Sequence, residues 1–172
     1  METQQETQEV TMKAAEPQKE HEWLQKLVGE WTMEGDPSAE ADQAHGPWTE
    51  TVRSLGGLWI LAEGQGEMPG GGSATTVMTL GYDPQRQRYV GTWIGSMMTH
   101  LWIYEGTLDA TGNVLTLDSE GPGMSEESQG KMAKYKDAIE FKSDDHRVLT
   151  SHVQGENGEW TLFMTAHYRR KK

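Results

Sequence analysis

The feature that most constrains this fold is a series of about ten short strand-like segments, spread over residues 31–168 and separated by turn signals. The turns have typical hairpin chemistry, as at residues 83–85 (Asp-Pro-Gln) and 155–158 (Gly-Glu-Asn-Gly). Parallel neighbours would require long crossovers, which the short turns exclude. Ten antiparallel strands in one layer curl and close, which removes exposed edges. The sequence therefore predicts an all-β fold, a single antiparallel up-and-down β-barrel of about ten strands.

One helix is expected, and it precedes the first strand. Trp23, Leu24, Leu27 and Val28 recur with the spacing of one helical face over residues 20–28, and Gly29 follows as an end signal. This short N-terminal helix is expected to plug one end of the barrel, while the last strand pairs back onto the first.

The first eighteen residues differ in character from the rest of the chain. Residues 1–18 are rich in Glu, Gln and Thr, and have only Val10 and Met12 as larger apolar groups. Such a segment cannot offset the entropy of ordering, so it is predicted to be a disordered leader to a barrel domain over residues 19–170. It lacks the basic and apolar regions of a secretory signal, which favours a cytoplasmic protein.

Charge and composition exclude several functions. The chain carries 15 Lys and Arg against 27 Asp and Glu, a net charge of −12, which repels nucleic acid and anionic membranes. No run of residues is long and apolar enough to span a membrane as a helix. The absence of cysteine excludes disulfides and thiolate sites.

The two ends of the predicted barrel resemble a known structural signature. Gly29-Glu30-Trp31 follows the helix, and Arg169 and Arg170 end the last strand. This arrangement is similar to that of the calycin superfamily, which includes lipocalins and fatty-acid-binding proteins. The resemblance implies that Trp31 packs beneath the barrel and that one of the two arginines lies across it.

Three internal motifs give a closer resemblance. They are Leu-Gly-Gly-Leu-Trp at 55–59, Leu-Gly-Tyr-Asp-Pro at 80–84 and Tyr-Val-Gly-Thr-Trp at 89–93. They look like those of a bacterial family of unknown function assigned a calycin-like barrel. The resemblance covers roughly residues 20–170 and supports the fold, with no activity to carry over.

The segment from residue 89 to residue 104 is the richest in candidate binding residues. In a strand over 98–106, alternation places His100, Trp102 and Tyr104 on one face and Leu101 and Ile103 on the other. The mixed polar and aromatic face is expected to line the interior. The apolar face is then outward, covered by the leader or by a second subunit of a homodimer. The full set of predicted ligand-binding residues is Trp59, Trp93, Met98, His100, Trp102, Tyr104, His152, Trp160 and Met164.

The histidines do not have the spacing of a metal site. His100, His152 and His167 fall on three different predicted strands, with no short-range ligand pair among them. No metal and no cofactor are therefore expected. Haem is an alternative, because some intracellular barrels of the resembled superfamily hold it through a single histidine, here His100 or His152.

The predicted function is binding of a small apolar or aromatic molecule within the barrel. One alternative is an enzyme that uses the same interior, with His100 or Glu63 as acid or base; Glu63 could equally face water. A second alternative is a structural or assembly module whose barrel is filled by its own side chains.

Overall fold

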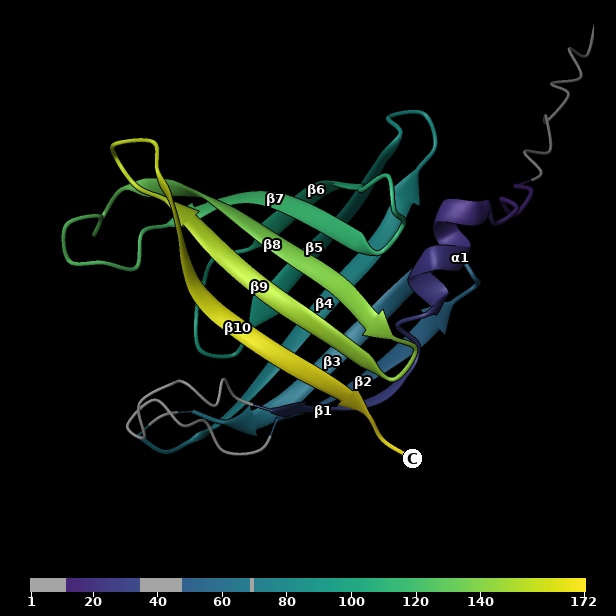
Figure 1. Cartoon of the computed structure of the whole chain (residues 1–172), viewed down its shortest axis with the longest axis horizontal. Helices are drawn as coiled ribbons and strands as arrows, with labels where there is room; N and C mark the ends of the chain where they lie inside the picture. The colour runs from purple at the N-terminus through teal and green to yellow at the C-terminus, as the bar shows by residue number, and fades with distance from the viewer. Residues whose placement is uncertain (1–11, 35–47, 69) are drawn as a thin grey trace, which may run out of the picture.

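The computed structural model describes residues 12–34, 48–68 and 70–172. Most of the predicted leader lies outside these residues, and so does the segment 36–46, whose polar sequence predicts a loop. Within these described ranges the chain forms one short helix and ten strands (Figure 1). They are α1 (Lys19–Gln25), β1 (Gly29–Glu34), β2 (Trp48–Leu55), β3 (Trp59–Glu67), β4 (Ser73–Asp83), β5 (Arg88–Gly95), β6 (Trp102–Leu108), β7 (Val114–Pro122), β8 (Met132–Ser143), β9 (His146–Gln154) and β10 (Trp160–Arg170).

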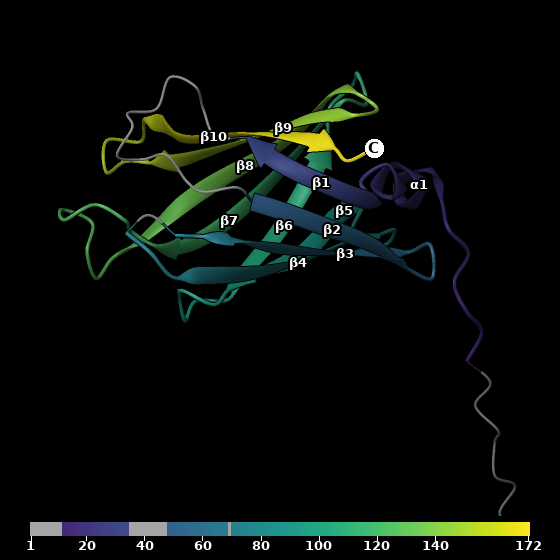
Figure 2. The ribbon, with the colours of Figure 1, turned by 90° about the horizontal axis from the view of Figure 1, so that it is seen from below.

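The ten strands form one closed antiparallel barrel, as predicted. Each strand pairs with its neighbours in the chain, and β1 also pairs with β10, which gives the order β1-β10-β9-β8-β7-β6-β5-β4-β3-β2. The seam between β1 and β10 joins Trp31 to Arg170 and Glu34 to His167 in register. Figure 2 shows β1, β2 and β10 side by side around this seam.

The helix is fixed to one end of the barrel, next to the turns that follow β2, β4 and β6. Trp23, Leu24 and Leu27 are buried in the same cluster as Trp31. The Trp23 indole N–H donates to the Gly112 carbonyl at 2.7 Å. The predicted helix over 20–28 is too long at its carboxyl end. The amides of residues 26–28 bond three residues back rather than four, which tightens the last turn before β1.

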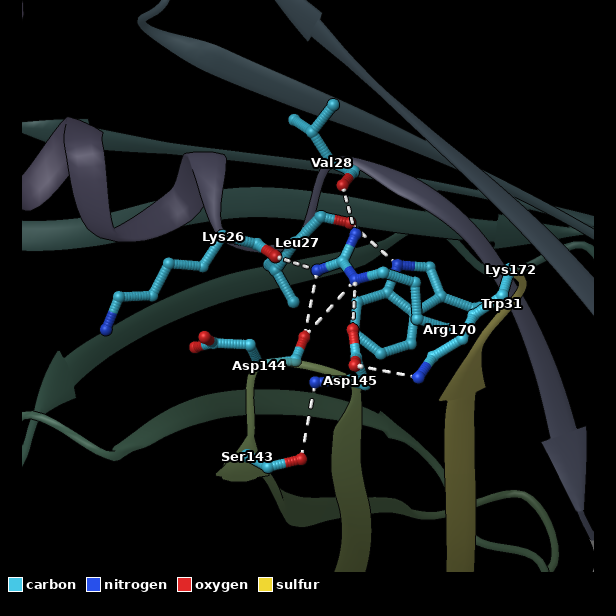
Figure 3. Close-up of polar contacts among 9 residues, drawn as sticks. All are labelled: Lys26, Leu27, Val28, Trp31, Ser143, Asp144, Asp145, Arg170 and Lys172. Carbon is cyan, nitrogen blue, oxygen red and sulfur yellow. Dashed lines mark hydrogen bonds and ion pairs between the residues drawn. The ribbon is translucent and has the colours of Figure 1, made fainter.

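Trp31 and Arg170 close this end of the barrel (Figure 3). Trp31 has no exposed surface, and its indole N–H donates to the Leu27 carbonyl at 2.8 Å. The Arg170 guanidinium lies 4.3 Å from the Trp31 ring centroid. It donates to the carbonyl oxygens of Val28 at 2.7 Å and Asp144 at 3.1 Å. The prediction that an arginine crosses a buried Trp31 is thus confirmed, and the arginine is Arg170.

One predicted strand is displaced. β6 begins at Trp102, whereas the sequence predicted a strand from residue 98. The cause lies in the segment just before it. The Ser96 amide donates to the Thr75 carbonyl at 2.8 Å, and the Ser96 hydroxyl accepts from the Thr75 amide at 2.9 Å. Because these bonds hold the chain on β4, residues 96–101 cross to β6 without a ladder partner.

Candidate functional site

The interior of the barrel changes in character from the helix end to the opposite end. Side chains near α1 form a packed apolar core around Trp31. A set of polar residues lies above it, on β2, β6, β8 and β9. Tryptophans that are only half buried line the inner wall at the far end, where β2 and β6 begin and β5 and β7 finish. The interior is therefore most accessible at the end opposite the helix.

A buried ion pair lies directly above Trp31. The Arg147 guanidinium bonds to the Glu50 carboxylate, and their side chains are only 3% and 10% exposed. The same guanidinium lies 4.0 Å from the Tyr168 ring centroid and 4.7 Å from that of Trp31. Burying both charges is costly unless they neutralise each other, as they do here. Burial, reinforced by the Glu50 carboxylate, raises the pKa of Tyr168 well above its usual range.

A second polar cluster centres on Asp137. The Tyr104 hydroxyl donates to Asp137 Oδ2 at 2.8 Å, and Ser151 lies in register with Asp137 on the neighbouring strand. Burial raises the pKa of Asp137, while the hydroxyls of Ser151 and Tyr104 and the nearby His152 oppose the rise. Tyr104 is buried as well, and its pKa lies far above the usual range of a phenol. Asp137 is thus a carboxyl group on the inner wall that accepts a hydrogen bond from the Tyr104 hydroxyl.

The Ser119 hydroxyl, next to this cluster, has no hydrogen-bond partner among the described residues. The indole nitrogen of Trp48, at the far end, and Nε of Arg147 also have none. Ser119 is 8% exposed and lies opposite Tyr135, one inward position along the β7–β8 ladder from the Leu117–Asp137 pair. Buried polar atoms without a partner are uncommon, because each loses its bonds to water. They mark a position at which a ligand could bond.

The far end of the interior is lined with aromatic rings that lie against glycines. A Cβ on each of these glycines would overlap the facing indole, and the pairs are Trp48 with Gly66, Trp93 with Gly95 and Trp102 with Gly121. The Trp102 ring also makes an edge contact with Tyr135, at 4.9 Å between centroids. Tyr135 in turn contacts Phe163, which is 44% exposed. Because these positions have no side chain, each flat ring can lie directly against the wall.

The wall is weakest between β6 and β7. The two strands pair only from Glu105 with Asp118 to Leu108 with Leu115. Residues 102–104 and 119–122 therefore have no partners across this gap, and Trp102 covers it from within. On the outer side a depression of about 690 Å³ follows the gap and extends across β8 to Trp160.

The predicted ligand-binding residues fall into three places. Those on the inner face are Trp93, Trp102, Tyr104 and Met164. Met98 and His100 lie at the rim, before β6 begins. Trp59, His152 and Trp160 lie on the outer face. Trp59 covers Gly81, and His152 is in register with Lys136, whose ammonium group lies over the Trp160 ring. The structure does not bring these last three together with Trp102.

The orientation predicted for β6 is confirmed. Tyr104 is buried and Trp102 half buried, whereas Ile103 is 64% exposed and Leu101 is exposed as well. The strand begins later than predicted, but the prediction that its even-numbered residues point inward is correct for Trp102 and Tyr104. The binding role of the inward residues stays a prediction.

The histidines are placed unfavourably for the haem alternative. His100 donates its Nε2 hydrogen to the Glu120 carbonyl at 2.9 Å, so that nitrogen is occupied. His152 lies on the outer face, opposite Leu162 and Lys136. His152 is therefore not placed to be an axial ligand inside the barrel, and haem binding through His100 stays a prediction. Within the described ranges, no group of three or more metal-ligating side chains occurs. Glu63, the other proposed acid or base, is exposed on the outer face.

Sequence reasoning missed Glu50, Asp137, Arg147 and the unpartnered Ser119. A signal for two of them was present. Asp137 has the same parity as Tyr135 and Ile139, and Glu50 the same parity as Val52, all of which are buried apolar or aromatic residues. Parity thus places both carboxyl groups inward, although their charge is typical of outward positions.

A family model described as a protein of unknown function, DUF1579, matches residues 16–170. The chain belongs to the DUF1579 family. This DUF1579 barrel is similar to the crystal structure of Rv2717c from M. tuberculosis, with a TM-score of 0.56 and 13% sequence identity, over 88% of this chain and 96% of that one. At this identity the likeness shows the fold alone. No curated protein matches the sequence. Among the described residues, no helix is long and apolar enough to cross a membrane.

Proposed function

We propose that this DUF1579 protein is a calycin-like barrel that binds a small, largely apolar or aromatic molecule in its interior. The observation that carries the proposal is the change in burial along the inner wall. Trp31 is fully buried at the helix end, whereas Trp48, Trp93 and Trp102 are only half buried at the other end. The half-buried rings leave apolar surface at that end to which a ligand could bind.

The chemistry of the wall supports the same class of ligand. Binding sites for small molecules are mostly apolar and aromatic, with a few polar groups that orient the ligand. Flat indole rings provide the apolar surface here, and the Asp137 cluster lies deeper within the same interior. The Trp31 and Arg170 closure supports the calycin-like assignment.

Ligand binding is tested first by native mass spectrometry of gently purified protein. A retained small molecule would support the proposal directly. A second measurement titrates the protein with a neutral naphthalene probe, 1-naphthalenemethanol, and follows the quenching of tryptophan fluorescence. If a substrate panel were turned over as well, the enzyme alternative would gain support.

Matched variants locate the binding to the interior. Trp93→Leu removes a half-buried ring from the inner wall, and Trp160→Leu removes a ring from the outer wall. The inner substitution should weaken probe binding by about tenfold, equal to about 1.4 kcal/mol, and the outer one should have little effect. Equal losses in both variants, or no binding by the wild type, would contradict the proposal.

A further inference from the structure

Asp137 is a charged group in the interior that the apolar site does not explain. The other two buried charges, Glu50 and Arg147, neutralise each other. Among the described residues, no Lys, Arg or His forms an ion pair with Asp137. Its hydrogen-bond donor is the Tyr104 hydroxyl at 2.8 Å, and Ser151 lies in register with it on β9. A carboxylate can accept about four hydrogen bonds, so this group retains capacity for a further donor.

The neighbouring Ser119 hydroxyl adds a second free acceptor. It is more than nine-tenths buried, it has no partner among the described residues, and it lies on the same inner face as Asp137. A ligand group that donated to both residues would satisfy the unpaired hydroxyl and the carboxylate together. An ammonium group has three donors and a positive charge, whereas a carboxylate, the form of a carboxylic acid at neutral pH, is negatively charged and has no donor.

We infer that the ligand of this barrel carries a basic amine, which docks on Asp137 and Ser119 while its aromatic or apolar body lies against the tryptophans. The inference rests on the proposed function and names the polar end of its ligand. The net interior charge, one carboxylate beside a neutral ion pair, favours a cation.

Three probes of matched shape test the inference on the full chain: 1-naphthylmethylamine, 1-naphthalenemethanol and 1-naphthoic acid. Calorimetric titration at neutral pH should show that the amine binds at least about tenfold more tightly than the alcohol, and that the acid binds most weakly. This comparison uses the wild-type protein and does not depend on the folding of any variant.

Two variants then assign the preference to Asp137. Asp137→Asn keeps the shape of the side chain and should abolish the preference for the amine, with the alcohol affinity unchanged within about threefold. Asp118→Asn is the matched control, because Asp118 is an exposed carboxylate on the outer wall that pairs with Lys136. It should retain the preference. Ser119→Ala should reduce the preference in part.

The pH profile gives an independent measurement. The amine preference should decrease as the pH falls through the raised pKa of Asp137, because protonation removes the charge that the amine pairs with. The other titratable or charged groups near Asp137 are Tyr104, Tyr168 and His152, with the Glu50–Arg147 pair beyond Tyr168. These groups are still present in Asp137→Asn. The difference between the pH profile of the wild type and that of Asp137→Asn therefore reports the titration of Asp137 alone.

The outcomes separate this inference from the proposed function. If the alcohol binds but the amine binds no better, or the acid binds best, the amine assignment is overturned and the binding function stands. If Asp118→Asn abolishes the preference as fully as Asp137→Asn, the amine docks on the outer wall and the assignment is again overturned. If none of the probes binds, the proposed function fails and this inference fails with it.

Discussion

At the scale of single residues, Trp31 does most to hold the closed end of the barrel. Its ring is fully buried beneath two guanidinium groups, those of Arg147 and Arg170. Trp31→Ala should lower the free energy of unfolding by ~3–5 kcal/mol, as expected for truncation of a buried aromatic ring. Urea denaturation measures the change. Ile103→Ala, at a position that is 64% exposed, serves as the control and should be nearly neutral. A nearly neutral Trp31→Ala would remove the main local support for the closure.

Asp137 should affect stability in a pH-dependent way. Burial raises its pKa in the folded protein above that in the unfolded chain. A carboxyl group whose pKa is raised by folding stabilises the folded protein at pH values below its unfolded pKa. This stabilisation is lost as the pH rises through the folded pKa. Asp137→Asn, which cannot ionise, should therefore be more stable than the wild type at pH 7. The advantage should shrink as the pH is lowered toward the unfolded pKa.

Thermal unfolding across this pH range checks the prediction, with Asp118→Asn as the exposed control. A difference between Asp137→Asn and wild type that stayed constant with pH would show that Asp137 ionises as freely in the folded protein as in the unfolded chain.

The sequence could predict which face of a strand a residue lies on, but not which side chains it contacts there. Alternation predicted correctly that Trp102 and Tyr104 point inward, because period two is a property of one strand. The pairing of Glu50 with Arg147 spans 97 positions and depends on how β2 and β9 face each other across the barrel. No local pattern carries that information, so the buried polar centre could not be predicted.

At the scale of elements, the carboxyl end of β10 contributes two adjacent arginines with different roles. Arg170 bonds carbonyl oxygens from both sides of the closed end, whereas Arg169 lies on the outer face, 3.7 Å from Glu34. Arg170→Ala should lower the free energy of unfolding by about 2–3 kcal/mol, since bonds to a charged donor contribute more than neutral ones.

Arg169→Ala is the matched control for Arg170→Ala, with the same change in charge on the same strand. An exposed ion pair contributes little, so this variant should lose at most about 1 kcal/mol. Guanidinium chloride would screen the charges, so urea is the denaturant of choice. Equal losses in the two variants would indicate a general charge effect rather than a specific closure.

The turns are the reason that the strands themselves were predictable. Local chemistry defines them, as in the Asp83 carboxylate that accepts the Gln85 amide at 3.0 Å. β6 was displaced because its start depends on a tertiary contact, the bonding of Ser96 to Thr75 on β4. Where a contact with a residue far away in the sequence determines the end of a strand, the local sequence does not predict that end.

At the scale of the whole molecule, the leader is expected to be separable from the barrel. Residues 12–18 are exposed and form no regular structure. Removing residues 1–16 should change the melting temperature by no more than a few degrees, because little apolar surface is lost. Gln18 is retained in this variant, since its backbone N–H donates to His21 Nδ1 at 2.9 Å. A large loss of stability would show that the leader docks on the barrel, beside the depression of about 560 Å³ that residues 13–16 line together with Trp59.

The β1–β10 seam has a consequence for the order in which the protein assembles. Every other ladder joins strands that follow each other in the chain, whereas the Arg170 to Val28 bond closes a loop of 142 positions. Closing so long a loop is entropically costly, so the hairpins should form early and the seam after the rate-limiting step. Arg170→Ala should then speed unfolding in stopped-flow measurements and leave the refolding rate almost unchanged. The seam would be the place where the native barrel first opens.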